Sequence, residues 1–170
     1  MKKYLIATLA AGLIAGCGLL PGIGGQQVIG VFSGDWSTVD KSKMRLALVG
    51  LTSSGQFSYN NQLEIKDPNV TKRYALELPQ AAEEGSYQVV AYSDEDANGK
   101  FGSGDVVLGN TCHKYLLYSE SNGNKVFWVG TVQTLTVTKG WNGYDKKTQA
   151  APYKAENYEG FALYRTGQCP

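Results

Sequence analysis

The sequence predicts an all-β protein, folded as an antiparallel β-sandwich. Three observations support this fold class. Short apolar or alternating runs recur along the chain after Cys17, and Gly, Asn, Asp and Pro separate them. Helical periodicity is nearly absent, and the composition is rich in strand-forming residues, with 11 Tyr and many Val and Thr. Period-2 alternation between turn signals is typical of sandwiches and barrels.

Nine segments carry this strand pattern. In the second of them, Met44, Leu46 and Leu48 share one face and alternate with Arg45 and Ala47. The segment 79–84 (PQAAEE) has room for one helical turn, but we expect it to link two strands. Residues 146–159 are the least patterned, and we expect a surface loop there. The expected strands are Val28–Phe32, Met44–Leu51, Gln56–Tyr59, Tyr74–Leu78, Tyr87–Tyr92, Tyr115–Tyr118, Val126–Val129, Val132–Val137 and Phe161–Tyr164.

The N-terminus has the pattern of an export signal. Lys2 and Lys3 precede an apolar stretch, Tyr4–Ala15, which is shorter than the roughly 20 residues of a spanning helix. The stretch closes on LIAGC, which resembles the bacterial lipobox. The resemblance implies that residues 1–16 are a signal peptide and that Cys17 is lipidated and anchors the protein to a membrane. An ordinary signal peptide with an incidental cysteine is the alternative.

This interpretation sets the domain limits and the location. Residues 17–26 comprise the lipidated cysteine and a flexible tether, and residues 27–170 form the sandwich domain. By resemblance to lipoprotein sorting in two-membrane bacteria, Gly18 in place of an aspartate after the cysteine implies the outer membrane; in a one-membrane bacterium the same signal would imply the cell surface. Without residues 1–16, 14 basic residues face 15 acidic ones, so we expect no nucleic-acid partner.

Two further cysteines remain after Cys17. In an exported, oxidising setting Cys112 and Cys169 are expected to form a disulfide, which would secure the last residues of the chain. Free thiols or an intermolecular bridge are the alternatives.

The segment Asp94–Asp105 (DEDANGKFGSGD) matches the spacing of a calcium-binding loop. Gly99 stands at the turn position, where a positive φ is needed. Two features depart from the usual loop: position 12 is the shorter Asp, and Gly102 at position 9 offers no side-chain ligand. A metal-free hairpin with an Asn98-Gly99 turn is the alternative. The expected Ca²⁺ ligands are Asp94, Asp96, Asn98, the main-chain carbonyl of Lys100, and Asp105.

The run from Tyr74 to Asp105 resembles immunoglobulin-like or transthyretin-like sandwich modules of bacterial envelope proteins. The shared pattern is a strand, SYQVVAYSD, that runs directly into a D-x-D-x-N-G loop. The resemblance implies a sandwich fold with a calcium loop between two strands. Strands on both sides of the loop favour a structural calcium over a sensor, because sensors open a pair of helices.

The sequence gives little indication that the protein is an enzyme. His113 is the only histidine, whereas catalytic zinc and copper sites draw on several His or Cys residues. The Cys112-His113 pair is not expected to act as a dyad, because neighbouring side chains of a strand point to opposite faces and Cys112 has a disulfide partner. We therefore expect a non-enzymatic envelope protein with a structural or accessory role, and possible protein partners in the envelope.

A binding module for glycan or envelope polymer is the second hypothesis. Aromatic side chains in predicted loops could offer flat platforms on which sugar rings stack. The candidates are Trp36, Trp141 and Tyr144. The alternative for these aromatics is that they cover the rim of the core.

Overall fold

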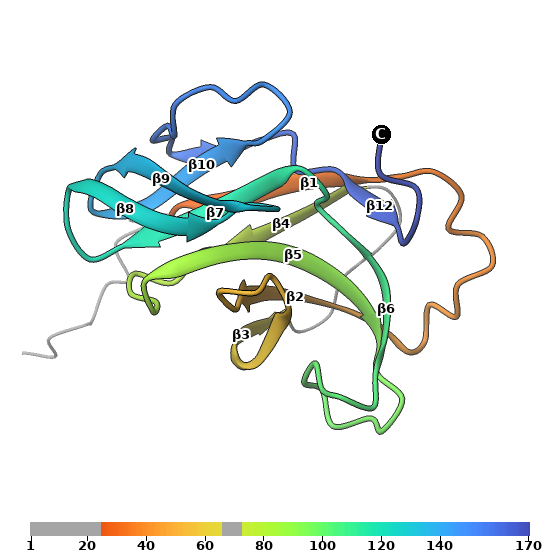
Figure 1. Ribbon diagram of the computed structural model, residues 1–170. Helices are drawn as coiled ribbons and strands as arrows, with labels where there is room; N and C mark the ends of the chain where they lie inside the picture. The colour runs from red at the N-terminus through yellow and green to blue at the C-terminus, as the bar shows by residue number, and fades with distance from the viewer. Residues whose placement is uncertain (1–24, 66–72) are drawn as a thin grey trace, which may run out of the picture.

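The computed structural model describes residues 25–65 and 73–170, and within these ranges every regular element is a strand (Figure 1). The all-β fold class is therefore confirmed. The strands are β1 (Gln27–Ser33), β2 (Met44–Leu51), β3 (Phe57–Ile65), β4 (Arg73–Glu77), β5 (Gly85–Ser93), β6 (Val106–Asn110), β7 (Lys114–Ser119), β8 (Gly123–Trp128), β9 (Val132–Val137), β10 (Gly140–Asp145), β11 (Asn157–Tyr158) and β12 (Leu163–Arg165).

The long, curved strand β5 is the centre of the sheet (Figure 1). It pairs antiparallel with β2, β6 and β7. The path β10-β7-β5-β6-β12-β1-β11 is continuous, with β3 added beside β2 and β4 beside β1. Most pairings are antiparallel, and the exceptions are the parallel pairs of β1 with β11 and with β12. The hairpin β8–β9 forms a separate two-stranded sheet.

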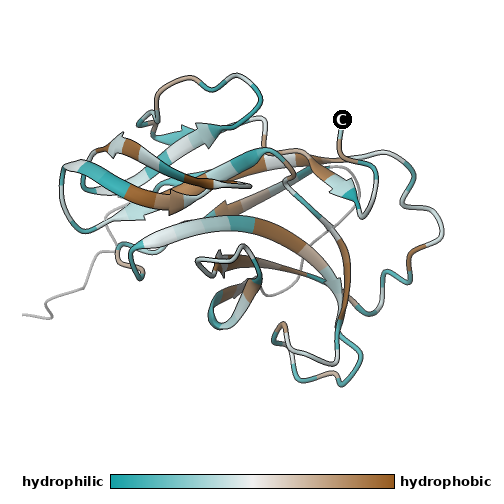
Figure 2. Cartoon of the chain, viewed as in Figure 1, coloured by the Kyte–Doolittle hydropathy of each residue, from teal (hydrophilic) through white to brown (hydrophobic). Residues whose placement is uncertain are grey.

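The main core lies between the pair of strands β1 and β4 on one side and the sheet around β5 on the other. This arrangement is sandwich-like. Alternation places Leu46 and Leu48 of β2 in this core, as expected. The opposite face of β2 is also buried, because Ala47 and Val49 join a second apolar cluster. Figure 2 shows apolar residues along β2 and in the middle of β5. Both central strands are thus covered on two sides.

Three strands, β6, β10 and β11, were not expected from the sequence, and β11 lies within the segment 146–159 that was expected to be a loop. The segment Gly140–Asp145 contains two glycines and an asparagine, yet it forms β10 through six register pairs with β7. The strand β6 directly follows the acidic loop that ends at Asp105, and it pairs with β5 and β12. Strand β3 also extends to Ile65, well beyond the expected Tyr59. Residues 79–84 link β4 to β5 without a helix, as expected.

The disulfide between Cys112 and Cys169 is confirmed, with a Cα–Cα distance of 5.7 Å. It joins the β6–β7 turn to the segment after β12. The expectation that Cys112 lies in a strand is wrong, since the residue has φ 53° and belongs to the turn. The signal peptide, Cys17 and most of the tether lie outside the described residues. Within 25–65 and 73–170 there is no helix of the length and apolarity needed to cross a membrane.

Candidate metal centre

The acidic loop Asp94–Asp105 connects β5 to β6, and the pairing of these strands determines its shape. Asp94 follows the last residue of β5, and Asp105 precedes the first residue of β6. The register pairs Ser93 with Val106, so the two ends of the loop lie next to each other. One carboxylate oxygen from each of Asp94, Asp96 and Asp105 lies within 4.8 Å of the others. This cluster could hold a metal ion.

Local hydrogen bonds curl the loop around these carboxylates. The Gly99 N–H donates to Asp94 Oδ2 at 3.1 Å, and the Asn98 N–H donates to Asp96 Oδ1 at 3.1 Å. Gly99 has φ 74°, as expected for its turn position, and Ala97 has φ 53°. Two left-handed residues so close together reverse the chain direction sharply.

Asp94 is the most unusual residue of the cluster. Its side chain is only 2% exposed, although it carries a charge. Asp94 Oδ2 accepts the Gly99 hydrogen bond and lies 3.7 Å from Arg45 Nε. The other oxygen, Oδ1, is buried and has no hydrogen-bond partner. A buried carboxylate oxygen without a partner is costly, so such groups are rarely left uncompensated.

Asp105 and Glu95 play different parts. Asp105 Oδ1 accepts the Glu95 N–H at 2.9 Å and Oδ2 accepts the Gly102 N–H at 2.7 Å, so this carboxylate joins the two halves of the loop. Glu95 instead forms an ion pair with Lys43 Nζ at 2.7 Å. The hydrogen bond from Lys43 holds the pKa of the Glu95 carboxyl below its usual range. Glu95 is therefore directed to the turn before β2 rather than to the cluster.

Of the other two expected ligands, the Asn98 side chain is hydrogen-bonded to one of the three carboxylates. Asn98 Nδ2 donates to Asp96 Oδ2 at 2.6 Å, and Asn98 Oδ1 accepts the Lys100 N–H at 2.6 Å. Asn98 therefore belongs to the same hydrogen-bonded loop as the cluster. Its amide oxygen faces the main chain of Lys100 in this structure.

Sequence reasoning missed three residues that hold the loop in place. Arg45 of β2 neighbours Asp94, while Phe101 is 3% exposed within the second apolar cluster. Gln62 of β3 hydrogen-bonds the main chain of Phe101 at both its N–H and its carbonyl. A phenylalanine inside an otherwise polar loop was the one local signal of such anchoring. The sequence around Arg45 and Gln62 gave no signal of their contacts with the loop.

Two of the three aromatic residues expected to offer sugar-stacking platforms in surface loops are buried. Trp141 and Tyr144 are 2% and 3% exposed, so their expected positions in surface loops are wrong. Both belong to β10, and the Trp141 ring packs between Tyr87 and Tyr118, with centroids 5.0 and 5.1 Å away. Trp36 is half-buried, packs on Phe32 and donates from Nε1 to Ser33 O at 2.8 Å. These rings contribute to the core and its rim.

The Cys112-His113 pair is not a catalytic dyad in this structure. The Cys112 sulfur is bonded to Cys169, so it is not available as a nucleophile. His113 Nε2 instead lies 3.0 Å from the main-chain oxygen of Pro170.

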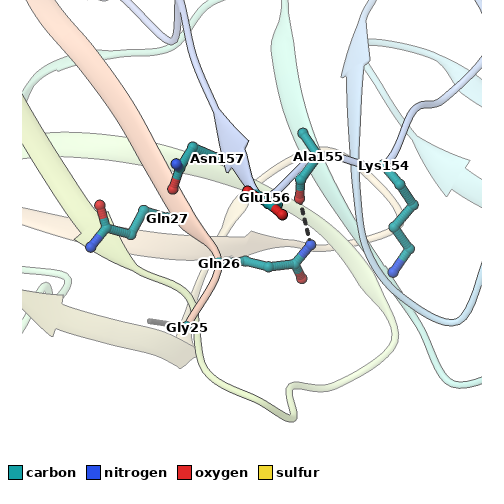
Figure 3. A pocket seen from close by; sticks show the side chains of 7 residues that line it. All are labelled: Gly25, Gln26, Gln27, Lys154, Ala155, Glu156 and Asn157. Atoms are coloured by element: carbon teal, nitrogen blue, oxygen red, sulfur yellow. Dashed lines mark hydrogen bonds between the residues drawn. The ribbon is translucent and has the colours of Figure 1, made fainter. Parts of the chain in front are cut away.

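A surface pocket of about 750 Å³ lies beside the start of β1 and β11 (Figure 3). Gln26 Nε2 crosses it to donate to Ala155 O at 2.7 Å. The pocket is polar and shares no residue with the acidic loop. It is lined by Gly25, Gln26, Gln27, Lys154, Ala155, Glu156 and Asn157.

No family model, curated protein or solved structure matches this chain.

Proposed function

We propose that this protein is a lipid-anchored, non-enzymatic component of the bacterial cell envelope, and that its β-domain is stabilised by Ca²⁺ bound between β5 and β6. One observation carries the calcium proposal: the buried, unpartnered Oδ1 of Asp94 within a cluster of three carboxylates. A cation in the cluster would supply the missing partner. It would also offset the mutual repulsion of the three aspartates.

The donor chemistry favours calcium over other metals. The ligands offered are oxygens only, which suit hard cations, whereas zinc and copper favour imidazole and thiolate. The proposed ligand set is Asp94, Asp96, Asn98, the Lys100 carbonyl and Asp105. Mg²⁺ demands an almost ideal octahedron and gives up its waters reluctantly, so a curled loop of this kind suits Ca²⁺ better.

The position of the loop supports a structural role. Both of its ends continue into strands that pair with each other, so the flanking elements have no open and closed arrangement comparable to a helix pair. Calcium at this position would clamp the end of the β5–β6 hairpin.

The anchor is proposed from the N-terminal pattern of Lys2, Lys3, an apolar stretch and Cys17. A diacylated cysteine holds a protein stably at a membrane surface, whereas a single chain binds reversibly. The glycan-binding alternative loses two of its three candidate residues, because Trp141 and Tyr144 are buried.

Thermal unfolding of chelator-treated protein, with and without calcium, tests the metal proposal. At about 5 mM Ca²⁺, roughly 100 times the middle of the expected Kd range of about 10⁻⁵–10⁻⁴ M, the gain should be about 2–3 kcal/mol. For a domain of this size that corresponds to about 4–12 °C in Tm. The exposed Asp96, changed by Asp96→Ala, should abolish the shift with little effect on the calcium-free Tm.

Asp35→Ala is the matched control, because Asp35 is also an exposed loop aspartate but lies between β1 and β2. This variant should keep the full calcium shift. Identical wild-type melts with calcium and with chelator would refute the proposal.

Mass spectrometry of protein extracted from its native membrane tests the anchor. The expected result is loss of residues 1–16 and acyl mass on Cys17. Cys17→Ser should release the domain from the membrane. A variant that stays membrane-bound would show that the anchor assignment is wrong.

A further inference from the structure

The acidic loop carries one large apolar side chain, Phe101, and this residue packs away from the carboxylates. Its ring centroid lies 5.3 Å from that of Tyr92, 5.3 Å from Tyr59 and 6.0 Å from Phe57. Tyr92 belongs to β5, whereas Phe57 and Tyr59 belong to β3. Phe101 therefore bridges the central strand and the strand at the edge of the sheet.

Gln62 of β3 strengthens this contact with two hydrogen bonds. Its Nε2 donates to Phe101 O at 2.6 Å, and its Oε1 accepts the Phe101 N–H at 2.9 Å. The primary amide thus satisfies both main-chain groups of Phe101, as a neighbouring strand would. Gln62 and Phe101 are 39 residues apart along the chain, so this contact joins the loop to a distant strand.

Strand β3 lies at the edge of the sheet, where the contact with Phe101 covers part of it. It pairs with β2 and with no other strand of the described chain. Its register with β2 shifts between Val49 and Leu51, which interrupts the hydrogen-bond ladder there. Tyr59 and Leu63 remain 49% and 39% exposed. An edge strand with exposed apolar side chains is a site at which another strand can add.

The metal cluster and Phe101 belong to the same short loop. Asp96 precedes Phe101 and Asp105 follows it, so any ion that holds these two carboxylates restricts the main chain that carries Phe101. Without an ion the carboxylates repel one another, and the loop opens more readily.

We infer that calcium binding and burial of Phe101 against β3 are thermodynamically linked, so that calcium acts as a latch over the edge strand. This inference rests on the calcium site proposed above. Linkage is reciprocal: calcium must tighten the contact of the loop with β3, and weakening that contact must lower the affinity for calcium.

Hydrogen exchange of the wild-type protein tests the first direction. Peptides covering residues 57–63 should exchange at least about fivefold more slowly in Ca²⁺ than in chelator. The hairpin β8–β9 is the internal control, because it forms a separate sheet and should change much less. Equal exchange in β3 with and without calcium, in protein shown to bind the ion, would overturn the latch while leaving the metal site intact.

Calorimetric titration of Ca²⁺ into Gln62→Leu tests the reverse direction. This variant keeps the bulk of the side chain but removes both hydrogen bonds to Phe101, so its Kd should rise about tenfold. Asn60→Ala is the matched control, since Asn60 lies exposed on the same strand. Its Kd should equal that of the wild type.

An unchanged Kd for Gln62→Leu would refute the latch. A wild-type protein that takes up no calcium would refute both the latch and the proposed metal site. The exchange experiment needs no variant, so its outcome is independent of whether Gln62→Leu folds.

Discussion

The Tyr74 hydroxyl donates a buried hydrogen bond to the main-chain oxygen of Phe161 and so joins β4 to the segment before β12. Gly30 of β1 lies directly beneath this bond. It is the register partner of Tyr74, and the neighbouring Ile29 O accepts the Phe161 N–H at 3.1 Å. A β-carbon at Gly30 would collide with both the Tyr74 ring and the Phe161 oxygen.

Gly30→Ala should therefore destabilise the domain by overpacking, by about 1–3 kcal/mol or more. Gly85→Ala is the control, because a β-carbon there meets nothing within 4 Å. Denaturant unfolding should separate the two variants clearly. Equal stability of both would show that β1 and the Phe161 segment can move apart at little cost.

Ala97→Gly should stabilise the protein. Ala97 has φ 53°, a left-handed conformation that costs an L-residue about 1–2 kcal/mol, whereas glycine adopts it freely. Part of this gain is offset by the greater freedom of glycine in the unfolded chain, so about 0.5–1 kcal/mol should remain. Ala150→Gly, at a residue outside the left-handed set, should instead lower stability in the same unfolding assay. A loss at Ala97 would contradict this conformational account.

The double variant Cys112→Ser, Cys169→Ser should lose about 2–5 kcal/mol of unfolding free energy. The two cysteines are 57 residues apart, so the bridge removes much freedom from the unfolded chain. The sheet should persist, because Thr166 still donates its N–H to Leu108 O at 3.0 Å. Reduced wild-type protein should match the variant in urea unfolding. A variant as stable as oxidised wild type would be contrary to this expectation.

Alkaline conditions should destabilise the domain. Burial raises the pKa of Tyr115 to about 12, and burial also raises the pKa of Tyr74 and Tyr158. In the unfolded chain a tyrosine titrates near pH 10, so the unfolded state loses its proton first. Stability should be constant below about pH 10 and should fall as pH rises through the folded pKa values.

Melting curves between neutral and strongly alkaline pH measure this effect. Tyr115→Phe keeps the ring but removes one titrating group, so its Tm should fall less steeply above about pH 10. An equal slope for the variant and the wild type would eliminate Tyr115 as a contributor.

Much of the fold followed from local pattern. Side chains alternate along a strand whatever its neighbours are, so Met44–Leu51 could be predicted with its end residues and its inward face. The spacing of Asp94, Asp96 and Asp105 likewise marked the acidic loop, and the structure brings these three together. With Cys17 predicted to be lipidated, the two other cysteines allowed only one intramolecular bridge, Cys112–Cys169, which the structure contains.

Tertiary structure alone decided which surfaces became interior. The segment Gly140–Asp145 has the composition of a turn, and it is a buried strand because β7 supplies its hydrogen-bond partners. That pairing turned Trp141 from an expected surface platform into a core residue. Gln62 and Phe101 carry no mutual signal in the sequence, since their contact depends on how β3 and the acidic loop both pack against β2 and β5. The alternation of side chains and the spacing of motif residues are local properties of a chain. Burial of the second face of β2 and the approach of Asp94 to Arg45 depend instead on which distant strands pair.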